Sequence, residues 1–412
     1  MTDTALPLPP RRLHRVEFVA LMAMLIASIA FSIDAMLPAL PEIAEELSPD
    51  DINRAQLILT IFVLGMGVGT FVTGPISDAI GRKPVILIGA ALYCTASVAA
   101  WLAGSLELLL LARFVQGLGA AGPRIVALAI IRDLYAGRDM ARLMSFIMLV
   151  FTIVPAIAPT IGAGIIALVG WRGMFGAFIA FSLVSTAWLM IRQPETLPPE
   201  ARKPMRAGVL WRAVKEVLSL PMVRLSILVQ TLAQGMLFAV LSSTQQVYDL
   251  TYDQGAQFHF WFMGTAFLAA TASILNAVLV MRLGMRLLIT FALGGQIVLS
   301  SLMILFEITG PWGYGAGLTA WFLWSTSVFF MVGLTLGNLN ALAMEPLGHI
   351  AGLAASIVAS LATVGAVIIA IPIGLAFDGT PLPLSLGVLA CSVMGFALTR
   401  SMARLERVRA TP

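Results

Sequence analysis

Charged residues are scarce in this sequence. Only 11% of its 412 residues are charged, whereas 59% are hydrophobic. A soluble domain carries roughly 25% charged residues, because its surface must face water. The composition therefore excludes an ordinary soluble enzyme and indicates a chain whose surface faces lipid.

Cysteine and histidine are also rare, with two and three residues respectively. Two cysteines cannot form a disulfide framework, and the histidines lack the paired spacing that would suit a metal ion. Cys94 and Cys391 both lie in apolar runs, where a small buried thiol is the ordinary interpretation. We therefore expect no catalytic residues, no metal site and no cofactor.

Long apolar runs fill most of the chain. A helix needs roughly 20 residues to cross a hydrocarbon core of about 30 Å, and it bonds its own backbone amides on the way. Twelve runs reach that length, at residues 18–40, 55–76, 84–103, 106–131, 143–168, 173–191, 225–246, 258–280, 287–308, 314–337, 351–376 and 384–402. The sequence therefore predicts an all-α membrane protein with twelve transmembrane helices in two six-helix bundles.

The basic residues between the runs predict the orientation and the domain organisation. If the N-terminus is cytoplasmic, 21 of the 25 lysines and arginines fall in cytoplasmic segments, so we expect both termini in the cytoplasm. The longest hydrophilic segment carries seven basic residues against three glutamates. We expect an N-terminal bundle at 1–191, a cytoplasmic linker at 192–224 and a C-terminal bundle at 225–412, related by an axis along the membrane normal.

A short polar loop, GPISDAIGRK, follows the second run. Gly81 can adopt a positive φ at no steric cost, and Asp78 can bond a helix N-terminus or an arginine. The loop resembles the GxxxDxxGRK motif of the major facilitator superfamily, where it acts as a latch between helices. The resemblance assigns this role to Gly74, Asp78, Gly81, Arg82 and Lys83, although a structural turn explains the same residues. Residues 281–286 carry a faded copy that lacks the acid.

Two ionisable residues inside the runs are candidates for proton coupling. Arg113 begins the segment RFVQGLGAA, which resembles the RxxQGxGAA motif of the same superfamily. An arginine within the membrane costs on the order of 2.5–3.5 kcal/mol, so it needs a partner. Asp34 is the only acid deep inside an apolar run, and the helical rise places both residues roughly 10 Å from the external surface. We expect them to meet and to carry a proton, with a static ion pair as the alternative.

Further segments resemble the Bcr/CflA drug-resistance branch of that superfamily, which consists of drug:proton antiporters. Asp34 precedes LPALP, and residues 171–175 resemble the WRxxF segment of the branch. The fifth run contains PAIAPTIGAG, similar to the GPxxGG antiporter motif but with alanines at two glycine positions. Because each proline removes a backbone donor, we expect a kinked helix at Pro155, Pro159 and Gly162.

Several polar and aromatic residues are candidates for the wall of a substrate cavity. Arg124 lies about three turns after Arg113 on the same helix face. It either extends its side chain toward the cytoplasm or lines the cavity, where it would favour an anionic or zwitterionic substrate. In the second half the candidates are Gln230, Gln234, Trp324 and Asn338, which would suit loosely specified amphipathic ligands.

Together these patterns predict a secondary transporter of the bacterial cytoplasmic membrane. We expect it to export small amphipathic compounds in exchange for protons by alternating access, and to act as a monomer that does not bind nucleic acid. The alternative is a proton-coupled or facilitated importer of a small metabolite, possibly an anion. A channel is a third interpretation, but the sequence has no ring of charges and no filter segment.

Overall fold

The computed structural model describes residues 13–310 and 313–410, apart from the side chains of Ala141 and residues 403–410. Every regular element in this part of the chain is helical. The first half contains α1 (Arg15–Asp34), α2 (Leu40–Leu47), α3 (Leu57–Ile80), α4 (Arg82–Trp101), α5 (Leu106–Leu134) and α6 (Gly137–Arg192). After α7 (Ala207–Ser219) come α8 (Pro221–Gln246), α9 (Phe258–Leu283), α10 (Met285–Thr309), α11 (Tyr314–Met344), α12 (Ala351–Leu375) and α13 (Leu382–Ala410).

Ten stretches of the described chain are long and apolar enough to cross a membrane. Two of them, Gly137–Arg192 and Tyr314–Leu375, contain 56 and 62 residues, whereas one crossing needs roughly 20. The first is broken at Gly170, whose φ of 70° is not helical, and the short helix η6 (Glu345–Ile350) interrupts the second. Dividing both stretches at these breaks gives the twelve crossings that the sequence predicts, and the count stays a prediction that depends on this division.

The first helix is shorter than the sequence predicts. We expected it to continue to residue 40, but α1 ends at Asp34 and is followed by the 3-10 turn η1 (Leu37–Ala39) and by α2. Pro38 and Pro41 explain the difference, because proline has no backbone N–H and its ring clashes with the preceding turn. As a result, Asp34 is the last residue of a helix and does not lie in its interior.

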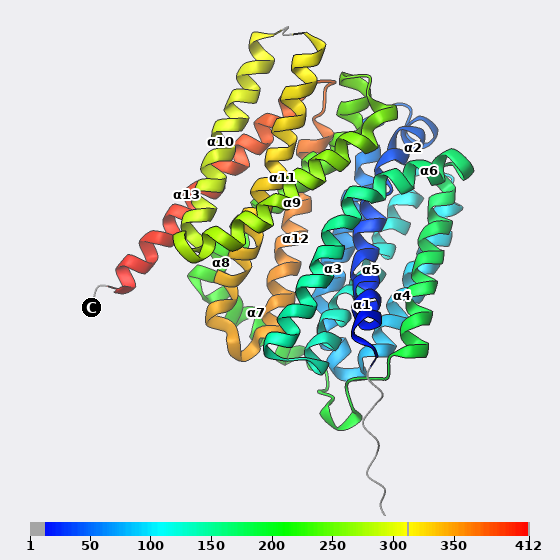
Figure 1. The fold of residues 1–412 in the computed structure, drawn as a ribbon, viewed down its shortest axis with the longest axis vertical. Helices are drawn as coiled ribbons and strands as arrows, with labels where there is room; N and C mark the ends of the chain where they lie inside the picture. The colour runs from blue at the N-terminus through cyan, green and yellow to red at the C-terminus, as the bar shows by residue number, and fades with distance from the viewer. Residues whose placement is uncertain (1–12, 311–312, 411–412) are drawn as a thin grey trace, which may run out of the picture.

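The two halves of the chain lie side by side (Figure 1). Helices α1–α6 pack mainly with one another on the right of the view, and α8–α13 do so on the left. The halves meet where α3 packs on α12 and α6 packs on α9. This arrangement agrees with two bundles, while the boundaries at 191 and 225 stay a prediction.

The segment between the halves is not an open linker. It contains the amphipathic helix α7, whose Ala213 and Val217 are buried in a cluster with Ala354 and Ile357 of α12. This segment lies at the bottom of Figure 1, which we call the linker end of the molecule. The opposite end, where α2 lies, is called the far end.

Close packing of α3 on α5 depends on small residues. A Cβ atom on Gly117 would lie 2.1 Å from the carbonyl oxygen of Phe62, and one on Gly65 would lie 2.0 Å from that of Phe114. These obstacles are backbone atoms, so a side chain at either glycine would force the helices apart. The glycines of the segment RFVQGLGAA therefore let two helices of the first half approach closely.

We predict that Gly117→Ala destabilises the protein by about 1–3 kcal/mol, because the added methyl group overpacks this contact. Gly164→Ala is the matched control, since a Cβ atom on Gly164 of α6 would meet nothing within 4 Å. Thermal unfolding in detergent measures both variants. Equal midpoints for the two would contradict the packing argument.

Candidate functional site

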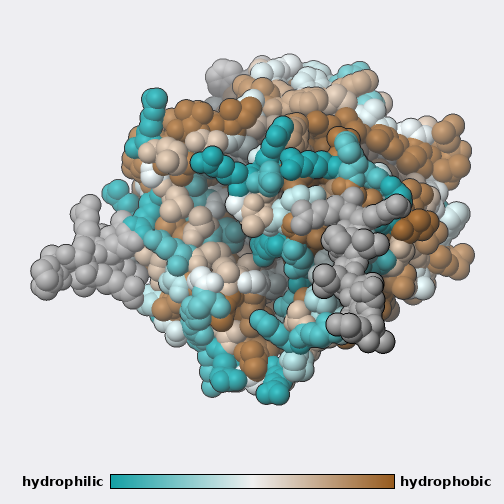
Figure 2. Space-filling view, turned by 60° about the horizontal axis from the view of Figure 1, so that its bottom comes forward, coloured by the Kyte–Doolittle hydropathy of each residue, from teal (hydrophilic) through white to brown (hydrophobic). Residues whose placement is uncertain are grey.

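A cavity of about 1040 Å³ lies between the two halves. Helices α1, α3, α5 and α6 line it on one side, and α8, α9, α11 and α12 on the other. Its wall also includes Lys203 and Arg206 from the segment at the linker end, so the cavity opens there. Figure 2 shows this end, with hydrophilic side chains around a hollow and hydrophobic ones toward the sides. The volume is at the upper end of the range for small-molecule sites, roughly 300–1,000 Å³.

Asp34 lies in the wall of this cavity. Asp34 is 6% exposed, and Ala30 and Ile33 of the same helix line the cavity beside it. Within the described residues no base lies within 4 Å of its carboxylate, and no hydrogen-bond donor reaches it. The structure therefore presents a carboxyl group to the cavity without a counter-ion from the protein.

The expected contact between Asp34 and Arg113 is not formed. Arg113 is fully buried, and its guanidinium donates to the carbonyl oxygens of Ile58 (3.2 Å) and Ser32 (3.1 Å) and to Oε1 of Gln116 (2.5 Å). It also lies 4.4 Å from the centre of the Phe62 ring. Neutral acceptors and the ring face therefore satisfy this cation, so the expected meeting of Asp34 and Arg113 is not observed, and the static ion pair that was its alternative is absent among the described residues. The role of the two residues in proton coupling stays a prediction.

A buried polar network extends from Arg113 through the first half. The side-chain amide of Gln116 donates to Oγ of Ser97 at 2.7 Å, and the hydroxyl groups of Ser32 and Tyr93 share a hydrogen bond of 2.6 Å. Together with the carbonyl of Ile58, these bonds join α1, α3, α4 and α5. The network ends two residues before Asp34, so it fixes the part of α1 that carries the carboxyl group.

Arg124 lines the cavity and makes no hydrogen bond or ion pair within the part of the chain that the structure describes. Of its two interpretations, the structure supports the one in which Arg124 faces the cavity. Gln234 also lines the wall, where its Oε1 accepts a hydrogen bond of 3.3 Å from Thr363.

Three of the predicted cavity residues lie elsewhere. Nε1 of Trp324 donates to Oγ of Ser300 at 3.1 Å, and the amide of Asn338 donates to Oδ1 of Asn276 at 2.7 Å. Gln230 is 4% exposed and is not part of the cavity wall. All three are buried in the second half, where Trp324 and Asn338 bond neighbouring helices of their own bundle. Their spacing along the sequence does not reveal that direction.

The proline-containing part of α6 approaches the end of α1. A Cβ atom on Gly162 would lie 2.2 Å from the carbonyl oxygen of Ala35, and Pro155 lines the cavity. The backbone of α6 stays helical through Pro155 and Pro159, and its one non-helical residue is Gly170. The expected kink therefore stays a prediction, whereas the close contact beside Asp34 is observed.

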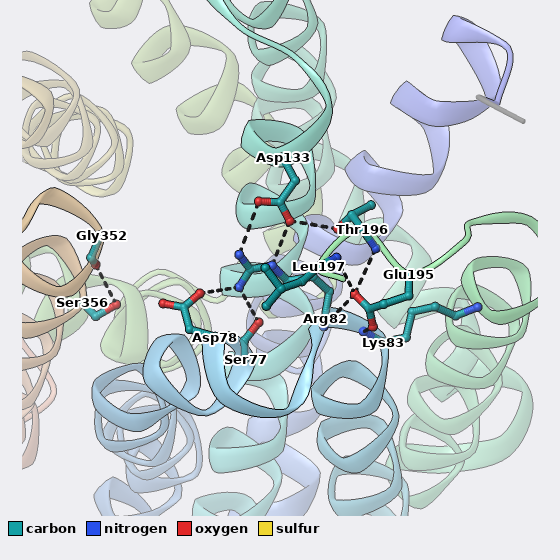
Figure 3. Close-up of polar contacts among 10 residues, drawn as sticks. All are labelled: Ser77, Asp78, Arg82, Lys83, Asp133, Glu195, Thr196, Leu197, Gly352 and Ser356. Carbon is teal, nitrogen blue, oxygen red and sulfur yellow. Dashed lines mark hydrogen bonds and ion pairs between the residues drawn. The ribbon is translucent and has the colours of Figure 1, made fainter. Parts of the chain in front are cut away.

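The predicted latch residues form an ion-pair cluster at the linker end (Figure 3). Gly81 adopts the expected positive φ, 108°, and Gly74 lines the cavity. Arg82 donates to Asp78 at 2.7 Å and to both carboxylate oxygens of Asp133 at 2.9 and 3.3 Å. Nζ of Lys83 donates to the carbonyl of Met190 at 3.0 Å. The latch role itself stays a proposal.

Sequence reasoning missed two acids in this cluster, Asp133 and Glu195. Glu195 accepts backbone N–H bonds of 2.9–3.0 Å from Arg82 and Lys83 at the start of α4, and further ones from Thr196 and Leu197. Both acids follow apolar runs that end on the same side of the membrane as Arg82. The sequence therefore contained a signal that could have placed both acids near Arg82, namely their position on the same side of the membrane.

Hydrogen bonds between the two halves close the far end. Four side chains take part, and we call them the far-end clasp: Asn53, Gln56, Ser243 and Gln246. Gln246 bonds Gln56 and Asn53, both at 2.6 Å, and Ser243 donates to Gln56 at 2.7 Å. Asn53 also donates to the carbonyl oxygens of residues 375 and 377 at 3.2 and 2.7 Å.

Comparisons with known proteins agree with this architecture. Residues 20–370 match the family model of the Major Facilitator Superfamily. A bicyclomycin resistance protein homolog of Haemophilus influenzae is 30% identical over 92% of this chain and 94% of its own length. The multidrug resistance protein MdtL of Shewanella oneidensis is 35% identical over 40% of this chain and 41% of its own.

Solved structures show the same fold at low sequence identity. The xylose transporter XylE from E. coli, in a partially occluded inward-open conformation, has a TM-score of 0.70 and 13% identity, covering 97% of this chain and 98% of its own. The human organic anion transporter MFSD10 has a TM-score of 0.63 and 19% identity, over 95% of this chain and all of its own.

We predict a pH-dependent contribution of Glu195 to stability. Burial alone would raise the pKa of Glu195, but four backbone N–H donors outweigh it and hold the pKa below its ordinary value of 4.5. Because the pKa is lowered in the folded state, the stabilisation is present above pH 4.5 and is lost as the pH falls further. Glu195→Gln should therefore lower the free energy of unfolding by about 1 kcal/mol at pH 7, and the difference from the parent should shrink below pH 4.5.

Thermal unfolding in detergent between pH 7 and pH 3.5 measures this difference. Glu200→Gln is the control, because Glu200 is exposed in the same segment and makes no hydrogen bond or ion pair among the residues described. If the free energies of unfolding of Glu195→Gln and the parent differ by the same amount across this range, the charge of Glu195 is not the cause of the stabilisation.

Proposed function

The chain belongs to the major facilitator superfamily and to its drug-resistance branch, and on this basis we propose that it exports small amphipathic compounds in exchange for protons by alternating access. The observation that carries the proposal is the place of Asp34. Its carboxyl group faces a cavity between two helical bundles, and no base in the described chain pairs with it. A group in this position can bind either a proton or a ligand.

Exchange follows from competition for the same carboxylate. When Asp34 is ionised, it attracts a cationic or hydrogen-bond-donating group of a ligand in the cavity. When a proton binds, that attraction is lost and the ligand is released. Because the two cannot be bound there together, net movement of protons inward drives movement of the ligand outward.

Arg113 acts in this scheme as a positioning residue. It does not contact the carboxyl group, but its bond to the carbonyl of Ser32 holds α1 against α5 two residues before Asp34. Gly162 of α6 fits against Ala35, one residue after Asp34. The carboxyl group is therefore held from both sides at the end of a helix.

Alternating access is supported by the contrast between the two ends. The cavity opens at the linker end, whereas the far-end clasp joins the halves at the other. The bias of basic residues toward one side favours a cytoplasmic linker end. This conformation would then be inward-open, and an outward-open conformation requires the clasp to separate. Asp78 lines the open mouth and would face the start of α12 once that mouth closes.

We predict that Asp34→Asn abolishes ligand-induced proton release, because the amide cannot titrate. Purified protein in weakly buffered detergent is mixed with a lipophilic cation such as tetraphenylphosphonium, and the released protons are measured with a pH indicator. The variant should also lose flux driven by a pH gradient in proteoliposomes while still inserting into the membrane.

Asp50→Asn is the matched control, since Asp50 is exposed at the far end and makes no ion pair within the described residues. It should behave as the parent does. Unchanged gradient-driven flux in Asp34→Asn would refute the assignment of the coupling carboxyl group.

We predict that Gln246→Ala opens the far end, because it removes two hydrogen bonds between the halves. Each bond contributes about 0.5–1.5 kcal/mol, so losing both should raise the ratio of open to closed far ends roughly 5- to 160-fold. Spin labels at Asp50 and Gln257, exposed in the two halves, report the distance between them.

Gln245→Ala is the control, because Gln245 is a buried amide of the same helix with no hydrogen bond to the first half in the described structure. It should leave the distance distribution unchanged. The same distribution in both alanine variants would exclude a gating role for the clasp.

A further inference from the structure

Ionisable residues in the cavity wall fall into two groups. Seven lie near the mouth at the linker end: Asp78, Arg82, Arg132, Asp133, Lys203, Arg206 and His349. The other two, Asp34 and Arg124, lie deeper. Arg124 precedes Arg132 by eight residues of α5, which is about 12 Å along the helix axis. No other described residue of the wall carries a charge at that depth.

Arg124 is half-buried, and it differs from the buried arginines Arg82 and Arg113 in having no acceptor among the described residues. Arg113 is satisfied by three oxygens and Arg82 by three acceptor residues, whereas no oxygen within the described chain accepts from Arg124. A guanidinium in a membrane-embedded site is costly unless an anion or acceptor compensates it. Since Asp34 is also unpaired, the deep part of the wall presents one unpaired cation and one unpaired anion to the same space, as far as the described residues go.

The two groups are too far apart to neutralise each other. The carbonyl of Ser32 contacts Arg113, and Asp34 follows Ser32 by two residues, so Asp34 lies about 3 Å beyond Arg113 toward the far end. Arg124 lies about 16 Å from Arg113 in the opposite direction, toward the linker end. Side chains on α1 and α5 lean toward their own helix N-termini, which brings these two toward each other. The charged groups are therefore separated by roughly 10–15 Å, more than the two charges of one α-amino acid could bridge.

Apolar side chains of both halves line the cavity that Asp34 and Arg124 share. Phe238 of α8, Phe262 of α9 and Phe329 of α11 line the cavity, with Gln234 as a neutral polar group. Phenylalanine faces suit an aromatic ligand body, and rings stack on them with little directional demand. Thus the first half supplies both charges at this depth, and the second half adds three aromatic faces to the apolar wall.

We propose that the cavity selects elongated zwitterionic amphipaths, with a cationic amine at Asp34, an anionic group at Arg124 and an aromatic body against the three phenylalanines. This inference rests on the proposed proton exchange. The amine competes with the proton for Asp34, so it provides the coupling, and the anion contributes affinity. An amphipath that carries an anion alone binds Arg124 best when Asp34 is protonated, so it takes up protons on binding and cannot drive exchange.

Other titratable groups near Asp34 do not change whether protons are released or taken up when a ligand binds. Tyr93 of α4 and Arg113 of α5 are its neighbours through Ser32, and both hydrogen-bond inside the network. The residues of α6, α8, α9 and α11 that line the cavity add no acid and no base. Asp34 is therefore the group that exchanges the proton when a ligand binds.

Three matched probes test the proposal: 4′-(aminomethyl)biphenyl-4-carboxylate, which is the zwitterion, 4-(aminomethyl)biphenyl, and biphenyl-4-carboxylate. Titration calorimetry in two buffers of different ionisation enthalpy gives the affinity and the protons exchanged, using the full chain in detergent. The parent should bind the zwitterion about 10-fold or more tightly than the amine, with proton release for both. It should bind the carboxylate with proton uptake.

Arg124→Gln should remove the preference for the zwitterion and leave the affinity for the amine equal or higher. Arg124→Lys should restore part of the preference, and Arg132→Gln, on the same helix near the mouth, should keep all of it. Asp34→Asn should weaken binding of the amine and the zwitterion and abolish proton exchange, while the carboxylate still binds. Equal affinities of the parent for amine and zwitterion, or equal losses for all three probes in Arg124→Gln, would overturn the proposal.

The same data separate the two levels of inference. If the amine releases protons but Arg124 does not discriminate between probes, proton exchange stands and the zwitterion site falls. If Arg124 discriminates but no probe releases protons, the binding site stands and the proposed exchange falls.

Discussion

The hydrogen bonds of Arg113 are the interaction on which the site depends. A guanidinium cannot be buried in a membrane protein without acceptors, and here a neighbouring amide and two backbone carbonyls supply them. Those bonds join α1, α3 and α5 at one level of the first half. Because Arg113 is satisfied in this way, it does not neutralise Asp34, and the carboxyl group is left to face the cavity.

The two halves contribute different chemistry to the same cavity. In the deep part of the cavity, the first half provides a carboxylate and a guanidinium, and the second half provides three phenylalanines together with neutral polar groups. The second half buries most of its other polar side chains within itself, as Trp324 does with Ser300. A relative movement of the halves therefore changes the apolar surroundings of the charges without breaking the network that holds them.

The two ends of the molecule are held by different forces. The far-end clasp consists of neutral amide and hydroxyl bonds, which are individually weak and can exchange partners with water. At the linker end, Arg82 is held by two carboxylates, and Glu195 fixes the chain after α6 to the start of α4. The ionic cluster lies within the first half and its connecting segment, whereas the clasp spans both halves, so opening the far end separates only the weaker bonds.

The sequence alone determined the apolar spans, because a run of about 20 apolar residues has few alternatives in water. It also identified Asp34 and the loop around Gly81, since an acid or a tight polar turn is conspicuous among apolar runs. Only the tertiary structure decided which arginine faces the cavity. Arg113 and Arg124 are eleven residues apart on nearly the same helix face. Helices α1 and α3 of the first half enclose Arg113, whereas Arg124 lies in the wall of the cavity between the halves. That difference depends on contacts with helices distant in the sequence.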